Sequence, residues 1–273
     1  MTVEELIVYG KSRVHSDLAK MLLADLMNVN SLELLTILDK VVNEEIEKTF
    51  KYRVDELQKG RPIQYIIGNV NFCGNQLEIN ENVLIPRFET EQLVVNTIEK
   101  IKELWPNQAI DLIDLGTGSG AIGLSIKKRL PQVNITLLDI SDKALEIAQK
   151  NATNLNINAK FIQNDMLENI NDKYDVIISN PPYIKTNEEI EDIVKNNEPH
   201  LALYAGEDGL DCYEKILSHI KYNLKEKYLI AFEIGDTQKQ DLYNLAEKYL
   251  INYNIECIKD FSNRDRMIFI YNK

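Results

Sequence analysis

Residues 110–126 read IDLIDLGTGSGAIGLSI, in which an apolar stretch runs through closely spaced glycines into a second apolar stretch. Glycine adopts positive φ without steric cost, so this pattern favours a tight turn from a strand into a helix. Backbone amides at the start of such a helix are free to face a ligand, and ligands of open parallel sheets bind beyond the carboxyl ends of the strands. The segment therefore predicts a ligand-binding loop that consists of Gly116, Thr117, Gly118, Ser119 and Gly120.

The loop alone does not identify its ligand. It also fits the dinucleotide pattern G-x-G-x-x-G, so a nicotinamide cofactor and S-adenosylmethionine both remain open. Asp139 ends the next predicted strand, in ITLLDIS, where a carboxylate can accept hydrogen bonds from both ribose hydroxyls of an adenosine. Asp165 and Met166 follow the third strand, in FIQNDM, and would suit the edge and the face of an adenine. These residues predict adenosine binding without naming the cofactor.

Strand-like and helix-like stretches alternate from residue 89 onward, which predicts a mostly parallel sheet covered by helices on both faces. The predicted strands are residues 110–115, 135–140, 160–163, 175–179 and 229–234, with helices between them such as 143–154 and 236–249. Two more strands are predicted at residues 255–258 and 267–271. The link between these two is so short that the sheet should end in an antiparallel pair. We therefore expect an α/β, Rossmann-like sheet of seven strands.

The segment YDVIISNPPY, residues 174–183, places the loop Asn180-Pro181-Pro182-Tyr183 at the end of the fourth strand. Two successive prolines fix φ and restrict the preceding residue, so the loop is stiff. At the carboxyl edge of the sheet, beside the glycine loop, such a loop is well placed to hold a reacting group.

The Asn-Pro-Pro-Tyr loop suits methyl transfer to a planar nitrogen. An amide nitrogen is a poor nucleophile because its lone pair is delocalised, as the rotation barrier of about 18–20 kcal/mol indicates. The Asn180 side-chain oxygen and the Pro181 carbonyl can each accept one N–H bond and aim the lone pair at a methyl sulfonium, while Tyr183 packs over the planar group. No strong base is needed, because the proton becomes acidic only after the bond has formed. We therefore predict an S-adenosylmethionine-dependent methyltransferase with Asn180, Pro181, Pro182 and Tyr183 as catalytic residues and Asn180 also at the cofactor.

The segments before residue 87 have a different texture. Apolar residues recur at helical spacing through the first sixty residues, and Gly60 and Pro62 supply a stop signal, so residues 1–60 are predicted to form a helical bundle. Residues 61–86 contain β-branched and aromatic runs, including Tyr65-Ile66-Ile67, and are predicted to form a β-hairpin linker. The α/β domain would then span residues 87–273.

Composition narrows the function classes. The 273 residues carry a formal net charge of -12, and a field of that sign disfavours a nucleic-acid partner. The three cysteines and three histidines are scattered, so neither a disulfide framework nor a metal site is expected. No apolar run is long enough to span a bilayer, and the first residues, MTVEELIVYGKSR, lack the layout of a signal peptide. We expect a cytoplasmic protein without a membrane partner.

The motifs together resemble the HemK/PrmC family, the glutamine methyltransferases of peptide-chain release factors. The resemblance rests on DLGTGSGAIGLS, YDVIISNPPYI, RPIQYIIGNVNF and LIPRFETE, and it extends to EPHLALYAGEDGLDCYEKI, FEIGDTQ and DFSNRDRM. It implies a class I methyltransferase core, a helical N-terminal domain that helps to recognise the partner, and the glutamine of a Gly-Gly-Gln tripeptide as the methyl acceptor. Class-1 release factors are the implied partners, S-adenosylmethionine is the implied cofactor, and we expect a monomer. The family's cofactor residues correspond to Gly116 to Gly120, Asp139 and Asn180.

Some positions depart from the family's usual pattern. Phe88 and Glu89 stand where relatives often have Pro and Asp, and Met166 stands where the residue is often aromatic.

Other residues of these motifs have two possible roles or a structural one. Arg87, Thr90 and Glu91 either line the site or pin the hairpin, whereas Glu233 and Arg266 are interpreted as structural.

Three other functions share part of this pattern. A DNA or RNA adenine amino-methyltransferase uses the same pocket chemistry, but it should carry a basic surface or a target-recognition domain, and the sequence shows neither. A nicotinamide-dependent oxidoreductase leaves the Asn-Pro-Pro-Tyr loop unexplained. A partner-binding protein that has lost catalysis is disfavoured by the intact loops, and a test of S-adenosylmethionine binding would separate it.

Overall fold

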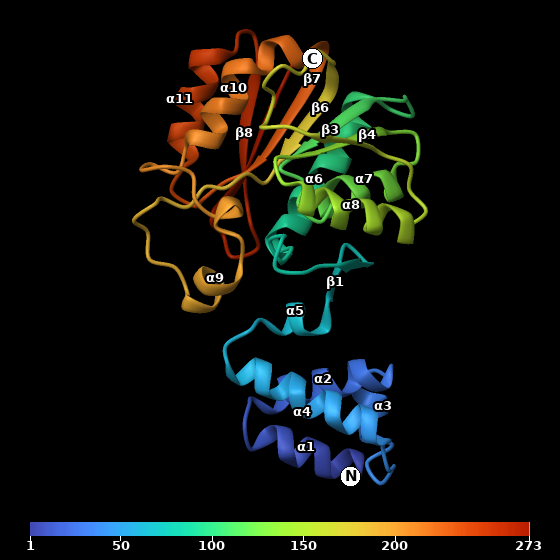
Figure 1. Ribbon diagram of the computed structural model, residues 1–273. Coiled ribbons are helices and arrows are strands. Elements are labelled where there is room, and N and C mark those ends of the chain that lie inside the picture. Colours follow the sequence, from blue (N-terminus) through green and yellow to red (C-terminus); the bar gives the residue numbers. More distant parts are fainter. Residues whose placement is uncertain (273) are drawn as a thin grey trace. The chain divides into compact units, whose positions relative to one another are not determined.

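The computed structural model describes residues 1–272, which form two compact units (Figure 1). The helical unit comprises Met1–Asn69 and Glu191–Asn197, and the sheet unit contains the other described residues. Each unit has its own hydrophobic core, and each is described by itself below.

The helical unit is a small bundle, as predicted. Its helices are α1 (Val3–Lys11), α2 (Ser16–Met27), α3 (Ser31–Leu35), α4 (Glu44–Gln58), α5 (Ile63–Ile67) and α9 (Asp192–Asn197). Thr2 begins α1 with a capping box that it shares with Glu5. A Cβ atom on Gly10 would lie 2.7 Å from the Cβ of Ala19, so this glycine lets α1 and α2 approach each other closely around the buried Phe50.

The run Tyr65-Ile66-Ile67, predicted to be a strand, is instead part of α5. Pro62 occupies the N-cap position, and Gly68, with φ of 88°, ends the helix in the left-handed region. A proline at the start and a glycine just past the end are strong helix boundaries. Here they outweigh the strand preference of the β-branched residues between them.

The hairpin lies just after α5. Its strands are β1 (Asn69–Phe72) and β2 (Asn75–Glu78), and the turn between them is Cys73-Gly74, with φ of 53° and 77°. Positive φ at both central residues is the geometry of the two-residue turn that matches strand twist. The buried Asn151 holds β2 in place, because it donates to the Glu78 carbonyl at 2.9 Å and accepts from the Glu78 amide at 2.7 Å.

The sheet has seven strands, which confirms the predicted fold. They are β3 (Asp111–Leu115), β4 (Asn134–Asp139), β5 (Lys160–Gln163), β6 (Tyr174–Ser179), β7 (Leu224–Glu233), β8 (Asn254–Lys259) and β9 (Asp265–Tyr271). Their order is β5-β4-β3-β6-β7-β9-β8, parallel from β5 to β7 and antiparallel at β9 and β8. The chain runs outward from β3 through β4 to β5 and then returns to β6, so the strand order reverses between β3 and β6. In such sheets the crevice at the reversal is the usual ligand site.

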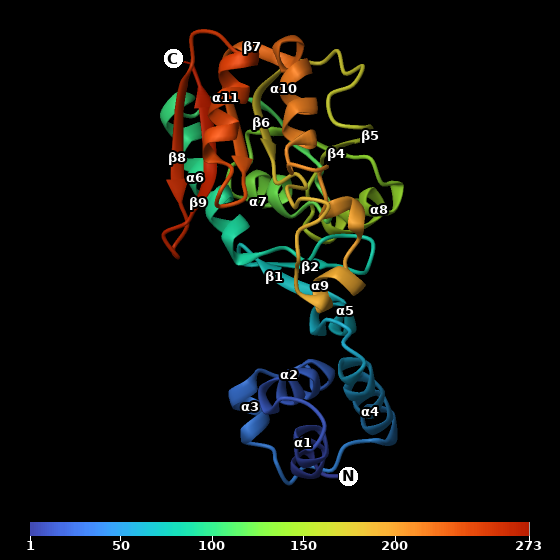
Figure 2. The ribbon, with the colours of Figure 1, turned by 90° about the vertical axis from the view of Figure 1, so that its left-hand side faces the viewer.

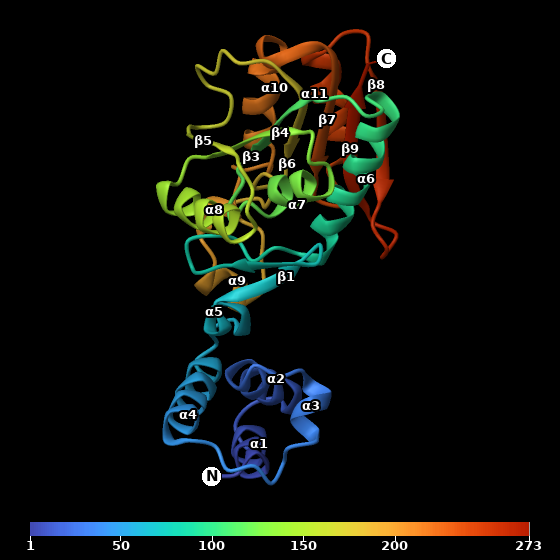
Figure 3. The same cartoon turned by 90° about the vertical axis from the view of Figure 1, so that its right-hand side faces the viewer.

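Helices cover both faces of this sheet (Figures 2 and 3). One face carries α6 (Phe88–Leu104), α7 (Ala121–Arg129) and α8 (Asp142–Asn154), and the other carries α10 (Asp211–Asn223) and α11 (Lys239–Tyr249). Side chains alternate between the two cores along each strand: Leu112 belongs to the first, and Ile113 to the second. Among the described helices, none combines the length and the apolar character that a membrane crossing requires.

Candidate active site

The glycine loop joins β3 to α7, as the sequence predicts. Gly116, Gly118 and Gly120 have φ of 66°, 55° and 81°, a region that side chains rarely adopt. A Cβ atom on Gly116 or Gly118 would meet no atom within 4 Å, and both residues line a cavity. The backbone here is therefore open to a ligand. Gly123 differs, because a Cβ atom there would lie 2.3 Å from the Leu137 side chain and would push α7 away from β4.

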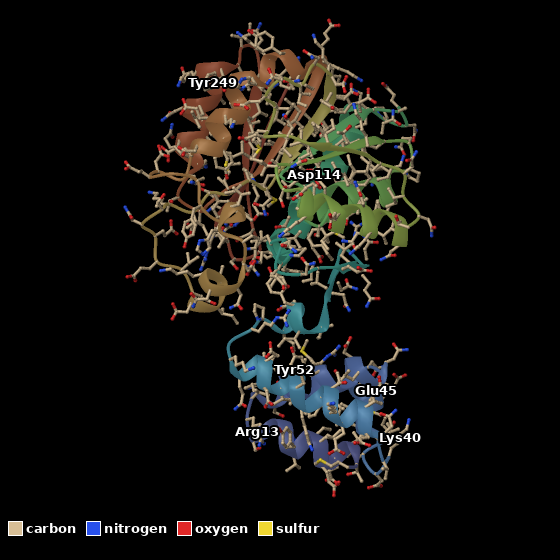
Figure 4. The ribbon with its side chains drawn as sticks, in the orientation of Figure 1. Arg13, Lys40, Glu45, Tyr52, Asp114 and Tyr249 are labelled. Carbon is tan, nitrogen blue, oxygen red and sulfur yellow. The ribbon has the colours of Figure 1, made fainter. Side chains whose placement is uncertain are left out.

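Asp114, which the sequence analysis did not single out, supports the loop from below. It lies fully buried in β3, in the interior of the sheet unit (Figure 4). Its Oδ2 accepts hydrogen bonds from the Thr117 hydroxyl at 2.6 Å and from the Gly123 amide at 3.0 Å. Burial raises the pKa of Asp114 to about 7, although these two hydrogen bonds oppose the shift. The available signal was an acidic residue within a mostly apolar strand, two residues before the first glycine of the loop.

The cavity lies at the carboxyl ends of the parallel strands. Of the predicted site residues, Gly116, Gly118, Asp139, Asp165, Met166, Asn180 and Pro182 line it. Thr117, Ser119, Gly120, Pro181 and Tyr183 are not among its lining residues. Further lining residues that the sequence analysis did not single out include Val83, Leu84, Ile140, Asn164 and Leu201. Thus two predicted loops and two predicted strand ends meet at one place.

Asp139 is held in place by backbone amides at the end of β4. Its Oδ2 accepts from the Gly118 amide at 2.8 Å, and its Oδ1 accepts from the Ser141 amide at 2.9 Å. Burial raises the pKa of this carboxyl, while the backbone hydrogen bonds oppose the shift. A carboxylate offers about four lone-pair sites, so each oxygen can accept one more hydrogen bond. Asp139 can therefore accept hydrogen bonds from two hydroxyl groups of a ligand in the cavity.

The loop after β5 presents one charged and one apolar group. Asp165 forms an ion pair with Lys215 of α10. Met166 lines the cavity with φ of 50°, which is uncommon for a residue other than glycine. Asn164 supports this turn, because its side chain donates to the carbonyls of Met166 and Glu168 at 2.9 and 2.7 Å. The Met166 side chain is thus offered to the cavity by a loop that hydrogen bonds hold in place.

Where the strand order reverses, side-chain hydrogen bonds hold the region of the Asn-Pro-Pro-Tyr loop to the end of β3 and to α6. The hydroxyl of Ser179, directly before the loop, donates to the Leu115 carbonyl at 2.7 Å and so joins the end of β6 to the start of the glycine loop. Asn180 donates through Nδ2 to the Thr90 hydroxyl at 3.2 Å. The Tyr183 carbonyl accepts from Gln238 at 3.1 Å, and burial, followed by the charge of Glu233, raises the pKa of the Tyr183 phenol to about 12. Tyr183 is therefore neutral and its backbone is fixed.

The structure separates the roles of the residues in LIPRFETE. Arg87 forms an ion pair with the buried Glu198, which also accepts from the Ile85 amide at 3.1 Å. Glu91 accepts from the Cys73 amide at 2.9 Å and so holds the hairpin turn. Thr90 contacts the Asn-Pro-Pro-Tyr loop instead, and it is the member of this group that reaches the site.

Comparison with known proteins agrees with this geometry. Residues 12–68 match the PrmC N-terminal domain family, and residues 88–202 match the methyltransferase small domain family. The release factor glutamine methyltransferase of Bacillus cereus is 35% identical over 92% of this chain and 90% of its own length, and that of Streptococcus pneumoniae is 37% identical over 98% and 94%. The chain belongs to the release factor glutamine methyltransferase family.

This member of the release factor glutamine methyltransferase family shares its fold with a solved methyltransferase structure. The RsmC methyltransferase of Thermus thermophilus, solved with AdoMet and guanosine, has a TM-score of 0.55 and 14% identity over 75% of this chain and 50% of that chain. At that identity the likeness shows the fold alone.

The cavity of this family member fits S-adenosylmethionine, the cofactor of the family. Gly116 and Gly118 leave the backbone open where a substituent would enter the cavity, and Asp139 keeps acceptor capacity for a hydroxyl pair. The carboxyl group of Asp139 lies in the lining and suits a cationic ligand, whereas that of Asp165 is paired with Lys215. Within residues 1–272, no cluster of His, Cys, Asp or Glu is arranged to hold a metal ion.

Proposed function

We propose that this enzyme transfers the methyl group of S-adenosylmethionine to the side-chain amide nitrogen of the glutamine in the Gly-Gly-Gln motif of class-1 peptide-chain release factors. The reaction is inferred from the family, because the relatives that match over most of their length are release factor glutamine methyltransferases. The observation that supports a catalytic site at this cavity is the position of Asn180. Asn180 lines the cavity, and its Nδ2 donates a hydrogen bond to the Thr90 hydroxyl.

The residues assigned to the cofactor are those that line or shape the cavity. Gly116 to Gly120 would hold its amino-acid portion near the loop amides, Asp139 would accept from the ribose, and Asp165 and Met166 would flank the adenine. When bound, S-adenosylmethionine supplies an electrophilic methyl group on a sulfonium.

The Asn-Pro-Pro-Tyr loop would orient the acceptor glutamine. Asn180 Oδ1 accepts one N–H of the glutamine amide, and the Pro181 carbonyl accepts the other, so the nitrogen becomes pyramidal with its lone pair directed outward. Pro182 keeps the loop stiff, and the neutral Tyr183 contributes an aromatic surface and no charge. Orientation of this kind can supply up to about 7–11 kcal/mol of a barrier.

The finer parts of the proposal concern domains and partners. We assign substrate recognition to residues 1–60, a linker to residues 61–86 and catalysis to residues 87–273. We also propose that the enzyme acts as a monomer in the cytoplasm and forms no stable complex with nucleic acid, in line with its net charge of -12.

The test is methylation with labelled S-adenosylmethionine and a purified class-1 release factor, followed by peptide mapping. Label should appear on the glutamine of Gly-Gly-Gln, and a release factor with alanine at that glutamine should stay unlabelled. Duplex DNA and RNA are incubated in parallel. Label on nucleic acid and none on the release factor would replace this proposal with an adenine amino-methyltransferase.

A further inference from the structure

Three residues from separate elements form a hydrogen-bonded chain behind the catalytic loop. The Thr90 hydroxyl on α6 donates to Glu233 Oε2 at the end of β7 at 2.7 Å. Asn180, after β6, donates through Nδ2 to the same hydroxyl oxygen at 3.2 Å. Thr90 is 4% exposed and Glu233 is 2% exposed, so water does not compete for either group. The chain therefore runs from a buried carboxylate to the edge of the cavity.

Each hydrogen bond in this chain sets the direction of the next. An ionised carboxylate can only accept, so Thr90 gives its single hydroxyl hydrogen to Glu233. The Thr90 oxygen is then left as an acceptor and takes a hydrogen from the amino end of the Asn180 amide. Within residues 1–272, Asn180 Oδ1 has no hydrogen-bond partner, and Asn180 lines the cavity. The chain thus distinguishes the two ends of an amide that are nearly equal in shape.

We propose that Thr90 and Glu233 are positioning residues that fix the Asn180 amide with its oxygen toward the methyl acceptor. This inference rests on the proposed function, in which that oxygen accepts an N–H of the glutamine. A reversed amide would place its own NH₂ group against the NH₂ group of the substrate, and two donors cannot pair. Correct orientation of Asn180 is therefore a condition for methyl transfer, and it is enforced from outside the loop.

The charge state of Glu233 controls the orientation. Burial raises the pKa of Glu233 to about 7, opposed by the hydrogen bond from Thr90 and the charge of Arg266 on β9. Glu89 on α6 raises this pKa further, and the nearby Asn180 amide lowers it. The phenols of Tyr183 and Tyr213 also face the group, and the Tyr213 hydroxyl donates to the Glu233 carbonyl at 2.7 Å.

Protonation of Glu233 would remove the constraint on the direction of the chain. A protonated carboxyl can donate to the Thr90 oxygen, which frees the Thr90 hydrogen to point at Asn180 and allows the amide with its oxygen turned inward. The ionised form is the competent one, so the rate of methyl transfer should rise with pH through about 7.

The experiment compares variants in single-turnover methylation of a release factor at saturating S-adenosylmethionine. Thr90→Val removes the hydroxyl and keeps the shape, and the rate should fall roughly 10- to 100-fold, less than the loss expected when an acceptor itself is removed. Thr90→Ser keeps the hydroxyl and should recover most of the rate. Affinity for S-adenosylmethionine, measured by calorimetry, should not change in either variant.

Thr97 supplies the matched control. It is fully buried on the same helix, and its hydroxyl oxygen has no hydrogen-bond partner in the described part of the chain. Thr97→Val therefore removes a buried hydroxyl without touching the site, and its rate should equal that of the wild type. If Thr90→Val were also as fast as the wild type, Thr90 would have no positioning role.

Glu233→Gln tests the charge dependence. Its rate should lack the rise near pH 7 that the wild type shows, because the titrating group is gone. The same rise in both proteins would exclude Glu233 as its origin. Failure of the proposed function is recognised separately: a wild type that does not methylate release factors, or an Asn180→Ala variant that methylates them normally, contradicts the site itself and not only the chain behind it.

Discussion

Replacing Asn180 with alanine tests the assignment of the catalytic loop. The substitution removes the Oδ1 acceptor at the cavity and the amide donor that Thr90 accepts at 3.2 Å. It should leave the path of the loop unchanged, because Pro181 and Pro182 fix the backbone on one side and Ser179 holds the Leu115 carbonyl on the other. The expected effect is therefore chemical and not a collapse of the loop.

The magnitude follows from the number of acceptors that remain. In the proposed geometry the glutamine amide has two acceptors, and the variant keeps only the Pro181 carbonyl. Loss of one aimed group in a closed site lowers turnover on the order of 100- to 1000-fold, or about 2.7–4 kcal/mol. Asn180→Asp should also be slow, because it replaces the donor to Thr90 with a second acceptor and places a negative charge near the buried Glu233.

The assay is single-turnover transfer of labelled methyl to a release factor at saturating cofactor. Calorimetry checks that S-adenosylmethionine still binds, and thermal melting checks that the variant is folded. If folded, cofactor-saturated Asn180→Ala enzyme transferred methyl at the wild-type rate, the reasoning that places the acceptor glutamine in this loop would be refuted.

The remaining predictions concern the cofactor and the scaffold. Asp139→Ala should weaken S-adenosylmethionine binding by roughly 1.5–3 kcal/mol, the range for a hydrogen bond to a charged group, and unchanged calorimetric affinity would remove Asp139 from the site. Gly123→Ala should lower the free energy of unfolding by about 1–3 kcal/mol through its clash with Leu137, which urea titration can measure, and an unaffected midpoint would contradict the packing argument. Burial raises the pKa of Asp114 from 3.8 to about 7, so the folded state holds a proton that the unfolded state has lost between those values, and stability should decline as pH rises through that window. Asp114→Asn should show a smaller decline in urea unfolding between about pH 4 and pH 7, and equal declines in both proteins would count against it.

Much of the sheet could be predicted from the sequence because its inner strands are short apolar runs. β5 was predicted with its observed bounds, β3 and β6 differ from prediction by one residue at one end, and β4 differs by one residue at both ends. β7 begins at Leu224 and not at Leu229, because the charged run Lys225-Glu226-Lys227 interrupts the apolar pattern at the start of the strand. Lys225 is satisfied there by ion pairs with Asp111 at 2.5 Å and Asp175 at 2.7 Å. Ion pairs between residues so far apart in the sequence leave no local pattern from which they could be predicted.

The candidate site divides in the same way. The glycine loop and the Asn-Pro-Pro-Tyr loop could be found because each is a local run whose backbone chemistry is unusual. Thr90 could be noted but not assigned, and Glu233 was interpreted as structural, because their hydrogen bond joins positions 143 residues apart. Arg266 keeps its structural interpretation, since it donates to the Ile234 carbonyl at 2.9 Å and to Asp260 at 3.2 Å. The assignments of individual residues to cofactor and substrate remain predictions until variants are measured.

Asn151 couples the hairpin to the glycine loop through hydrogen bonds. Besides both backbone groups of Glu78, its side chain binds the Ser119 carbonyl at 2.9 Å, so one buried amide spans β2, α8 and the glycine loop. Any displacement of the hairpin then changes the energy of the loop, and by thermodynamic reciprocity occupation of the loop changes the preferred position of the hairpin by the same free energy. Substitutions in the hairpin that displace β2 would therefore alter the affinity for the cofactor, although no hairpin side chain needs to touch the cofactor.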